Sequence, residues 1–383
     1  MRETENQPTN EPTPAAYLAR MPKADLHVHL IGTVRASTFA ELAGRAGLDL
    51  PDAPEAIWRD INSLPPDPEL YRNTRIPVPQ ERSPDEPEVS YSLFRASGWV
   101  EEALRDADDL TRITYEAFED AHRGAVRHLE LHVDDVPPRL AEAGLGFHGL
   151  VEACAEGIRL AERDFGMTGR LIASIDRSRD AEWALDYVRR AVERPHEYLA
   201  GIGLVNLELA GPPERFVEAY RLAGDAGLRR TAHASEHAPV AVNTATCLDL
   251  LGCDRIDHGY YVLEDDDLVA RCRDEGVPFT VISTTSRRSW RPWRRASIAA
   301  MVDAGLNVVL ASDDPGMFPT SLADEYRIAA ETIGVPRARL REMSLRSIEA
   351  AWLPAADRAA ARARFESELA ALDEEFPTGG TGA

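Results

Sequence analysis

ADLHVHL, residues 24–30, is a short apolar run that carries two histidines in its second half. Its length and composition are typical of a β-strand. Residues two apart in a strand point to the same face, so His27 and His29 can bind one ion. One such pair is weak evidence, because a buried histidine is often purely structural. The rest of the chain has to supply the other ligands.

Three more clusters of polar residues each follow an apolar run. They are HASE at 233–236, DHG at 257–259 and SDDP at 312–315. Strand ends that lie far apart in sequence converge at the carboxyl face of a closed parallel barrel. We therefore predict one metal site, with His27, His29, His233 and Asp313 as ligands. This ligand set suits one Zn²⁺ per chain and leaves room for a water molecule, although iron and manganese accept the same ligands.

The chain as a whole alternates apolar runs with amphipathic stretches, which predicts a (β/α)8 barrel. The expected strands are Ala24–Leu30, Val126–Val133, Arg170–Asp176, Ile202–Leu209, Arg229–Ala234, Arg255–Tyr260, Pro278–Ser283 and Asn307–Ser312. The expected helices are Phe39–Ala46, Leu110–Arg123, Leu150–Arg163, Ala181–Glu193, Pro213–Ala226 and Trp293–Ala304.

The ends of the chain and one internal segment interrupt this pattern. Residues 1–16 and 376–383 are expected to be disordered, which leaves a single domain at 17–375. Residues 51–90 are rich in proline and charge, and we expect an insertion that forms no core element. Two interpretations stay open, a flexible surface segment or a lid over the barrel mouth. The aromatic residues that follow, Tyr91, Phe94 and Trp99, are expected in a helix core, with pocket lining as the alternative.

The charge of the chain limits its partners. Its 43 basic and 65 acidic residues give a formal charge of -22, which would repel a phosphate backbone. We therefore expect a small-molecule substrate and no nucleic acid. The four cysteines form no CxxC pair, no run is long enough for a membrane span, and the N-terminus does not resemble a signal peptide. These features predict a cytoplasmic protein with reduced thiols.

Candidate acid–base residues accompany the predicted ligands. Glu236 lies three residues after His233 and is expected to exchange a proton with the substrate. His258 is expected to orient or deprotonate the attacking water. Asp313, a predicted metal ligand, is also expected to take part in catalysis. Asp314 is expected to hydrogen-bond the substrate, and the alternative is that it caps the following helix.

With these motifs, the chain resembles the adenosine deaminase family of the metal-dependent amidohydrolases. The resemblance runs from about Pro22 to Ala330. It is carried by PKADLHVHLIGT at 22–33, RHLELHV at 127–133, LAG at 209–211, TAHASEHAP at 231–239, RIDHG at 255–259, TTS at 284–286 and SDDPGMFPTSLADEY at 312–326.

The resemblance implies hydrolytic deamination of a 6-aminopurine to a 6-oxopurine, with release of ammonia. It assigns His27, His29, His233 and Asp313 to zinc, Glu236 to protonation of ring N1, His258 to the attacking water, Asp314 to N7 and the Gly211 backbone to N3. His29 and Ile31 would border the substrate.

Ile31 departs from the family pattern, which has HLEG or HLDG here. In adenosine deaminases that acidic residue binds the ribose 5′-hydroxyl, and a hydroxyl facing isoleucine would lose about 1 to 3 kcal/mol of binding. Plain adenosine is therefore expected to be a poor substrate. Family members that deaminate 6-amino-6-deoxyfutalosine can carry an apolar residue at this position, so we expect a 5′-modified or otherwise unusual adenosine derivative. The alternative is that Ile31 only packs and a lid recognises the sugar.

Three further departures lie beside the motifs. Ser235 and Asp257 replace usual glycines and are expected to change the pocket shape or the hydrogen bonds of their histidine neighbours. The usual CPTSN is STTSR at 283–287. We expect Arg287 and Arg288 to be surface charges, with anion binding as the alternative.

Two other functions remain open. The same site could act on another heterocycle, such as adenine, a pterin or a purine of secondary metabolism. The chain could also be a binding protein that keeps the fold without catalysis, although the complete set of motifs argues against this. A cytidine-type zinc deaminase is excluded because no CxxC follows His128-Leu129-Glu130, and no HExxH indicates a metalloprotease.

Overall fold

The structure, a computed structural model, describes residues 14–62, 71, 74–79, 83–84, 91–285 and 288–377. Parallel strands form a nearly closed barrel in two sheets, ordered β1-β4-β5-β6-β7 and β11-β10-β9-β8. A bridge between Val28 and Asp313 joins the first strand to the last. The (β/α)8 prediction is confirmed. The barrel strands are β1 (Lys23–His29), β4 (Val126–Val133), β5 (Thr168–Asp176), β6 (Leu199–Val205), β7 (Arg229–Arg230), β8 (His233–Ala234), β9 (Ile256–His258), β10 (Pro278–Val281) and β11 (Asn307–Leu310).

The strand expected at 229–234 is divided into β7 and β8. The backbone N–H of Thr231 still donates to Ile202 O in β6, and Ala232 O accepts from the N–H of Asp257 in β9. The chain therefore changes its pairing partner from one side to the other within these residues. This change links the two sheets and brings His233 to the carboxyl end of the barrel.

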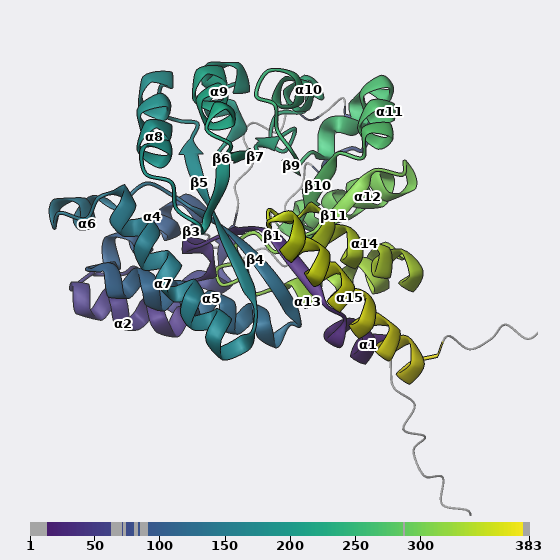
Figure 1. Cartoon of the computed structure of the whole chain (residues 1–383), viewed down its shortest axis with the longest axis horizontal. Helices are drawn as coiled ribbons and strands as arrows, with labels where there is room; N and C mark the ends of the chain where they lie inside the picture. Colours follow the sequence, from purple (N-terminus) through teal and green to yellow (C-terminus); the bar gives the residue numbers. More distant parts are fainter. Residues whose placement is uncertain are drawn as a thin grey trace, which may run out of the picture.

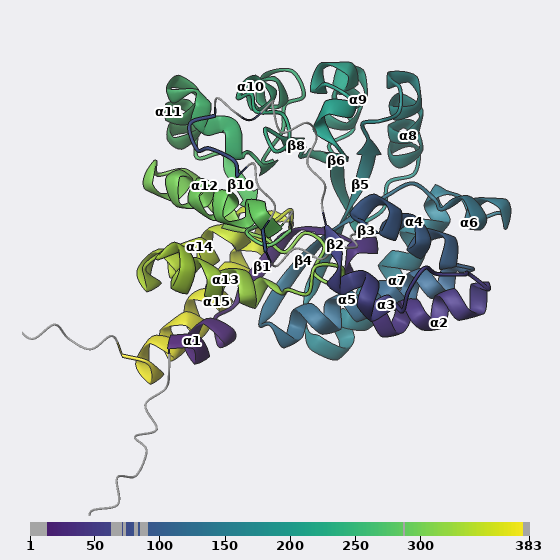
Figure 2. The ribbon, with the colours of Figure 1, turned by 180° about the vertical axis from the view of Figure 1, so that it is seen from behind.

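Helices surround the strands, as Figures 1 and 2 show from opposite sides. They are α1 (Pro14–Arg20), α2 (Ala36–Ala46), α3 (Pro54–Arg59), α4 (Leu93–Ala103), α5 (Ala107–Arg123), α6 (Pro138–Glu142), α7 (Phe147–Phe165), α8 (Ala181–Glu193), α9 (Val217–Asp225), α10 (Val242–Asp249), α11 (Asp266–Glu275), α12 (Arg291–Asp303), α13 (Leu322–Ile328), α14 (Arg337–Ala350) and α15 (Ala355–Glu375). Among the described residues, no helix is both long and apolar enough to cross a membrane.

Helix α5 illustrates how the outer layer is specified. Asp106 caps its first turn by accepting a hydrogen bond from Asp109 N, and the buried residues Leu110, Ile113 and Phe118 share one face. Gly157 of α7 lies against this helix, and a Cβ there would come within 2.7 Å of Thr111 O. The glycine therefore permits the close approach of the two helices.

The two ends of the described chain pack together beside the barrel (Figure 1). Helix α1 begins at Pro14, inside the segment expected to be disordered, because Tyr17 is buried against Phe376 and donates to Asp373. Phe376 is itself only 5% exposed, so the expectation of a flexible tail from residue 376 is wrong at its first residue. Residues 1–13 and 378–383 lie outside the described residues.

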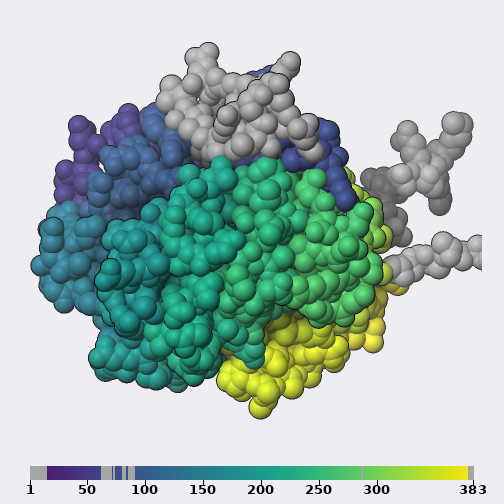
Figure 3. Space-filling model, turned by 90° about the horizontal axis from the view of Figure 1, so that it is seen from above, coloured from purple at the N-terminus to yellow at the C-terminus, as the bar shows by residue number. Residues whose placement is uncertain are grey.

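The expectation that 51–90 forms no core element is wrong in its described part. Helix α3 buries Trp58, which stacks on Phe39 at 4.9 Å between ring centroids and donates to Val34 O. Tyr71 is also buried, with its ring 4.8 Å from that of Trp290. Short strands β2 (Ile61–Asn62) and β3 (Tyr91–Ser92) pair in parallel beside them. Figure 3 shows this blue N-terminal region next to the teal and green part of the chain.

Candidate metal centre and active site

The predicted motifs lie at the carboxyl ends of the barrel strands. His27 and His29 belong to β1, His233 to β8 and His258 to β9, and Asp313 follows β11. Several residues at these ends have a positive φ without being glycine, a backbone conformation that is uncommon and concentrates at functional sites. They are Asn206 (74°), Ser235 (52°), His258 (69°) and Asp313 (63°).

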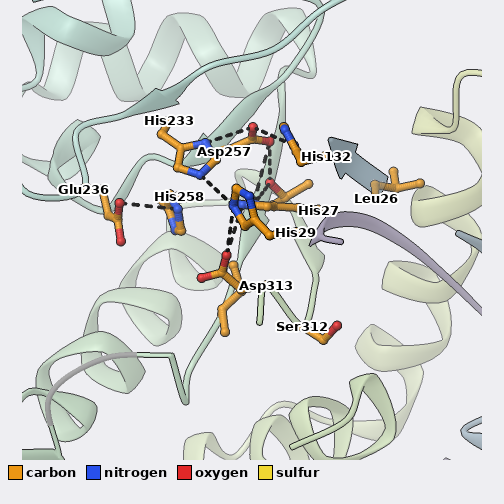
Figure 4. A network of polar contacts seen from close by, with 12 residues as sticks. Leu26, His27, His29, His132, His233, Glu236, Asp257, His258, Ser312 and Asp313 are labelled. Atoms are coloured by element: carbon orange, nitrogen blue, oxygen red, sulfur yellow. Dashed lines mark hydrogen bonds and ion pairs between the residues drawn. The ribbon is translucent and has the colours of Figure 1, made fainter. Parts of the chain in front are cut away.

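Three imidazoles and one carboxylate converge on one point (Figure 4). His29 Nε2 lies 3.2 Å from His233 Nε2 and 3.3 Å from Asp313 Oδ1. His27 Nε2 lies 3.4 Å from the same carboxylate oxygen. The structure thus brings together all four residues predicted as metal ligands, and it places His258 among them, with its ring centroid 4.8 Å from that of His27.

This donor set fits a metal ion. His27 Nε2 is buried and makes no hydrogen bond with any described residue, although it faces Asp313. Burial alone would lower the pKa of His29, but Asp313 and Asp314 help to raise it to about 10, which indicates a strongly negative potential. Burial lowers the pKa of His233 to about 4, so its imidazole is neutral, as a ligand must be. Nitrogen donors with one carboxylate are typical of zinc sites.

Glu236 faces this cluster from the loop after β8. Its Oε1 accepts a hydrogen bond from Arg294 at 2.7 Å, and its Oε2 lies 2.9 Å from His237 Nδ1 and 3.4 Å from His258 Nε2. Burial would raise the pKa of Glu236, but its interactions with His237, His258 and the Arg294 guanidinium hold it well below its ordinary value. The carboxylate is therefore ionised, and a proton that it gives to a substrate has to reach it from a neighbour.

His258 is the closest such neighbour on the metal side. Burial holds the pKa of this imidazole well below its ordinary value, against the opposing charge of Glu236. Its Nδ1 makes no hydrogen bond with the described residues. A neutral, buried imidazole between the metal ligands and Glu236 is suited to accept a proton from water and to pass it on.

Asp314 lines the cavity beside the ligands and is 6% exposed. Burial and the adjacent Asp313 raise its pKa to about 7. Gly32 makes room for it, since a Cβ at that position would lie 1.9 Å from Asp314 Oδ1. The next helix, α13, is capped by Ser321, so Asp314 is not its cap.

A cavity of about 510 Å³ extends from the ligands toward the rim of the barrel. His29 and Ile31 line it near the ligands, and Phe94, 44% exposed, lines it further out. Trp99 is instead buried in the core, as expected. Gly211 is not among the lining residues: it packs against Arg177, whose carbonyl oxygen would lie 2.2 Å from a Cβ at this position.

The outer part of this cavity is acidic. Glu101 of α4, Asp134 after β4 and Asp176 at the end of β5 line it, together with Arg179. Burial, followed by the charges of Asp134 and Asp176, raises the pKa of Glu101 to about 7. The Arg179 guanidinium lies 5.0 Å from the Trp183 ring centroid. This region therefore favours neutral or cationic groups over anions.

The departures from the family pattern find structural explanations. Ser235 occupies a left-handed backbone position, where a side chain costs about 1 to 2 kcal/mol. Its hydroxyl compensates by donating to Val240 O at 2.9 Å and contacting Thr244 Oγ1 at 2.7 Å. Arg288 donates to Arg59 O and is not among the cavity-lining residues, which is consistent with the surface interpretation. Arg287 lies outside the described residues.

Sequence reasoning missed three residues that organise the site. Arg294 reaches Glu236 from α12, and His132 lies among the ligand imidazoles with its ring 5.0 Å from that of His29. Glu208 accepts hydrogen bonds from the backbone of the loop that carries Glu236. Two of them are marked in the sequence without an assigned role: Glu208 directly precedes the LAG motif, and His132 lies inside the RHLELHV motif. Arg294 lies in none of the quoted motifs.

Comparisons with known proteins cover nearly the whole chain. Residues 87–367 match the family described as adenosine deaminase. An adenine deaminase of Streptomyces coelicolor is 32% identical over 95% of this chain and 98% of its own length. An adenosine deaminase of Aliivibrio fischeri is 28% identical over 90% and 98%. The crystal structure of an amidohydrolase from Burkholderia ambifaria, with bound zinc, is similar with a TM-score of 0.81 and 31% identity over 97% of both chains.

Proposed function

Because this chain belongs to the adenosine deaminase family and is a hydrolase that deaminates purines, we propose that its substrate is an adenosine-type nucleoside and its metal is zinc. The observation that carries the proposal is the position of Glu236 and His258. Both line the cavity together with three of the four proposed ligands, His29, His233 and Asp313, and they lie 3.4 Å apart. The ligands, an acid and a base therefore face the same small volume.

His27, His29, His233 and Asp313 would hold the zinc ion. When bound, zinc lowers the pKa of a coordinated water and makes it a nucleophile near neutral pH. The neutral state of His233 and the negative potential around His29 favour this ligand role.

The protein side chains supply the proton transfers. His258 accepts a proton from the attacking water as the water oxygen adds to C6 of the purine. The proton taken up by His258 passes across the 3.4 Å between the two side chains to the ionised Glu236, which delivers it to N1. The remaining proton on the new C6 hydroxyl is then moved to the amino group, with His258 as the carrier. The C6–N6 bond breaks, ammonia leaves and the C6–O bond becomes a carbonyl. The net reaction consumes one water and releases ammonia and a 6-oxopurine.

The cavity supports a nucleoside as the substrate. Its volume of about 510 Å³ lies within the range of ligand pockets and leaves space for a substituent beyond the purine ring. Ile31 borders this space near the ligands and offers no hydrogen-bond partner to a ribose 5′-hydroxyl. We therefore propose a nucleoside that is modified at the 5′ position.

The charge of the outer cavity argues against a 5′-phosphate. Glu101, Asp134 and Asp176 line it, and Arg179 is the one basic residue among the described lining residues apart from histidines. A phosphate placed there would lie among like charges in a partly desolvated site. The proposed substituent is neutral or cationic.

An ammonia-release assay of the zinc-loaded protein tests this proposal. The panel contains adenosine, 2′-deoxyadenosine, adenine, 5′-deoxy-5′-methylthioadenosine, aminodeoxyfutalosine, adenosine 5′-phosphate and a pterin. We expect the highest kcat/KM for a 5′-modified nucleoside. The Glu236→Gln variant should retain zinc and lose about a hundredfold in turnover, which would assign the activity to this site. Release of ammonia from the pterin alone, or from none of these compounds, would contradict the proposal.

Adenine is the second candidate, because the Streptomyces coelicolor relative carries the name adenine deaminase. A preference for the free base predicts that adenine has a higher kcat/KM than every nucleoside of the panel. The proposed role of Ile31 in favouring a 5′-modified nucleoside would then be wrong. The proposed roles of the metal ligands, Glu236 and His258 would stand.

A further inference from the structure

We propose that Asp257 is a positioning residue for the metal, a buried carboxylate that anchors two of the proposed ligand histidines from behind. Asp257 lies at the carboxyl end of β9 and is fully buried. It is not among the residues that line the cavity, so it does not reach a substrate. The inference rests on the metal site of the proposed function and concerns how tightly that site holds its ion.

The first anchor runs through Thr280 to His27. The Thr280 hydroxyl donates to Asp257 Oδ1 at 2.8 Å, and the same Thr280 oxygen lies 3.0 Å from His27 Nδ1. A hydroxyl has one hydrogen, and Thr280 gives it to Asp257. The Thr280 oxygen therefore accepts from His27 Nδ1–H. The lone pair of His27 is then on Nε2, the nitrogen that faces Asp313.

The second anchor is a direct contact with His233: its Nδ1 and Asp257 Oδ2 are buried and face each other, although neither makes a hydrogen bond with any described residue. Asp257 Oδ2 lies 3.3 Å from His233 Nδ1, while Nε2 of the same ring lies 3.2 Å from His29 Nε2 (Figure 4). A carboxylate beside Nδ1 favours the hydrogen on that nitrogen and leaves Nε2 unprotonated, as a ligand must be. One carboxylate thus sets the tautomer and the ring orientation of two ligands.

Two further polar groups face the Asp257 carboxylate. His132 Nε2 lies 3.6 Å from Oδ2 and Arg255 Nε lies 3.9 Å from Oδ1. Arg255 makes its shorter contact, 2.6 Å, with Glu130, so its charge is largely satisfied elsewhere. Asp257 therefore keeps its shorter contacts with Thr280 and His233, on the ligand side.

Zinc affinity, measured by competition with a chelator in the absence of substrate, tests the inference. We expect Asp257→Asn and Asp257→Gly to weaken zinc binding by about 10- to 100-fold, the usual effect of removing such a partner. Thr280→Val should weaken it less, because only the His27 anchor is lost. His233→Ala removes a proposed ligand and should give the lowest zinc affinity of the series. Asp254→Asn is the matched control, since Asp254 pairs with Arg229 outside the site.

Each affinity is referred to the folded fraction, which circular dichroism measures on the metal-free variants. Should both Asp257 variants fail to fold, Thr280→Val decides, with an expected loss of at least about threefold. Affinities within twofold of the wild type for the folded Asp257 variants, or for Thr280→Val in that case, would overturn the inference. Because no turnover is measured, this result is independent of whether the proposed substrate is correct.

Discussion

Arg294 donates a hydrogen bond to Glu236 Oε1 at 2.7 Å, and both side chains are buried. The guanidinium also donates to the Tyr260 hydroxyl at 3.0 Å, and that hydroxyl donates to Ile282 O at 2.8 Å. Helix α12 thus fixes one oxygen of the carboxylate. The other oxygen, Oε2, faces His258. The catalytic proton has to pass between these two side chains.

Replacing Arg294 by glutamine should slow turnover by about 10- to 100-fold, with a smaller change in KM. The arginine charge holds the pKa of Glu236 down, so its loss raises that pKa. The acidic limb of the pH–rate profile should therefore move to higher pH, which steady-state kinetics across pH will show. Arg295→Gln, on the same helix, is the control. An unchanged acidic limb in Arg294→Gln would contradict this role.

Glu208 should be essential for the loop that carries Glu236. Its carboxylate accepts hydrogen bonds from the backbone N–H groups of Ser235, Glu236, His237 and Ala238 and from Asn243 Nδ2. Glu208→Gln replaces one acceptor oxygen with a donor and leaves buried N–H groups unpaired. We expect a loss of about 2 to 4 kcal/mol in the free energy of unfolding, measured with urea, together with reduced turnover. Wild-type stability would show that these bonds do not hold the loop.

Ile31→Asp should improve plain adenosine relative to the 5′-modified substrate. The new carboxylate can accept from the ribose 5′-hydroxyl, an interaction worth about 1 to 3 kcal/mol, or roughly 5- to 150-fold in relative kcat/KM. Competition between the two substrates measures this ratio directly. Ile31→Val, which keeps an apolar side chain, should leave it unchanged. No shift in Ile31→Asp would mean that residue 31 does not contact the 5′ group.

Glu101→Gln should relieve the repulsion of adenosine 5′-phosphate in a pH-dependent way. Burial raises the pKa of Glu101 to about 7, so the wild-type carboxyl is largely neutral at about pH 6 and charged at about pH 8. The ratio of variant to wild-type kcat/KM for this nucleotide should therefore exceed one at the higher pH and approach one at the lower pH. Taking the ratio cancels the titration of the phosphate itself. A ratio that does not change with pH would count against this assignment.

The barrel and the ligand set could be predicted because their signals are local. Each ligand closes a short apolar run, and a closed parallel barrel brings such ends to one face. The positions of His27, His29, His233 and Asp313 follow from that rule. The single expected strand at 229–234 was less predictable, because its division depends on pairing with β6 on one side and β9 on the other.

The contacts behind the ligands could not be predicted from the sequence, because they form only in the folded chain. Arg294 meets Glu236 across 58 residues of sequence, and Arg255 meets Glu130 across 125. Neither pair has a local pattern. The described part of 51–90 was mispredicted for a different reason. Its average composition is polar, but it buries a few hydrophobic side chains in the core: Ile57, Trp58, Ile61, Tyr71 and Val78.

Metal-dependent deamination at the His–Asp cluster is tested most directly by ammonia release from the best nucleoside before and after removal of the metal. We expect the chelated protein to lose the activity while it stays folded, and stoichiometric Zn²⁺ to restore it. Deamination that continues at the original rate in protein shown to be free of metal would contradict the account.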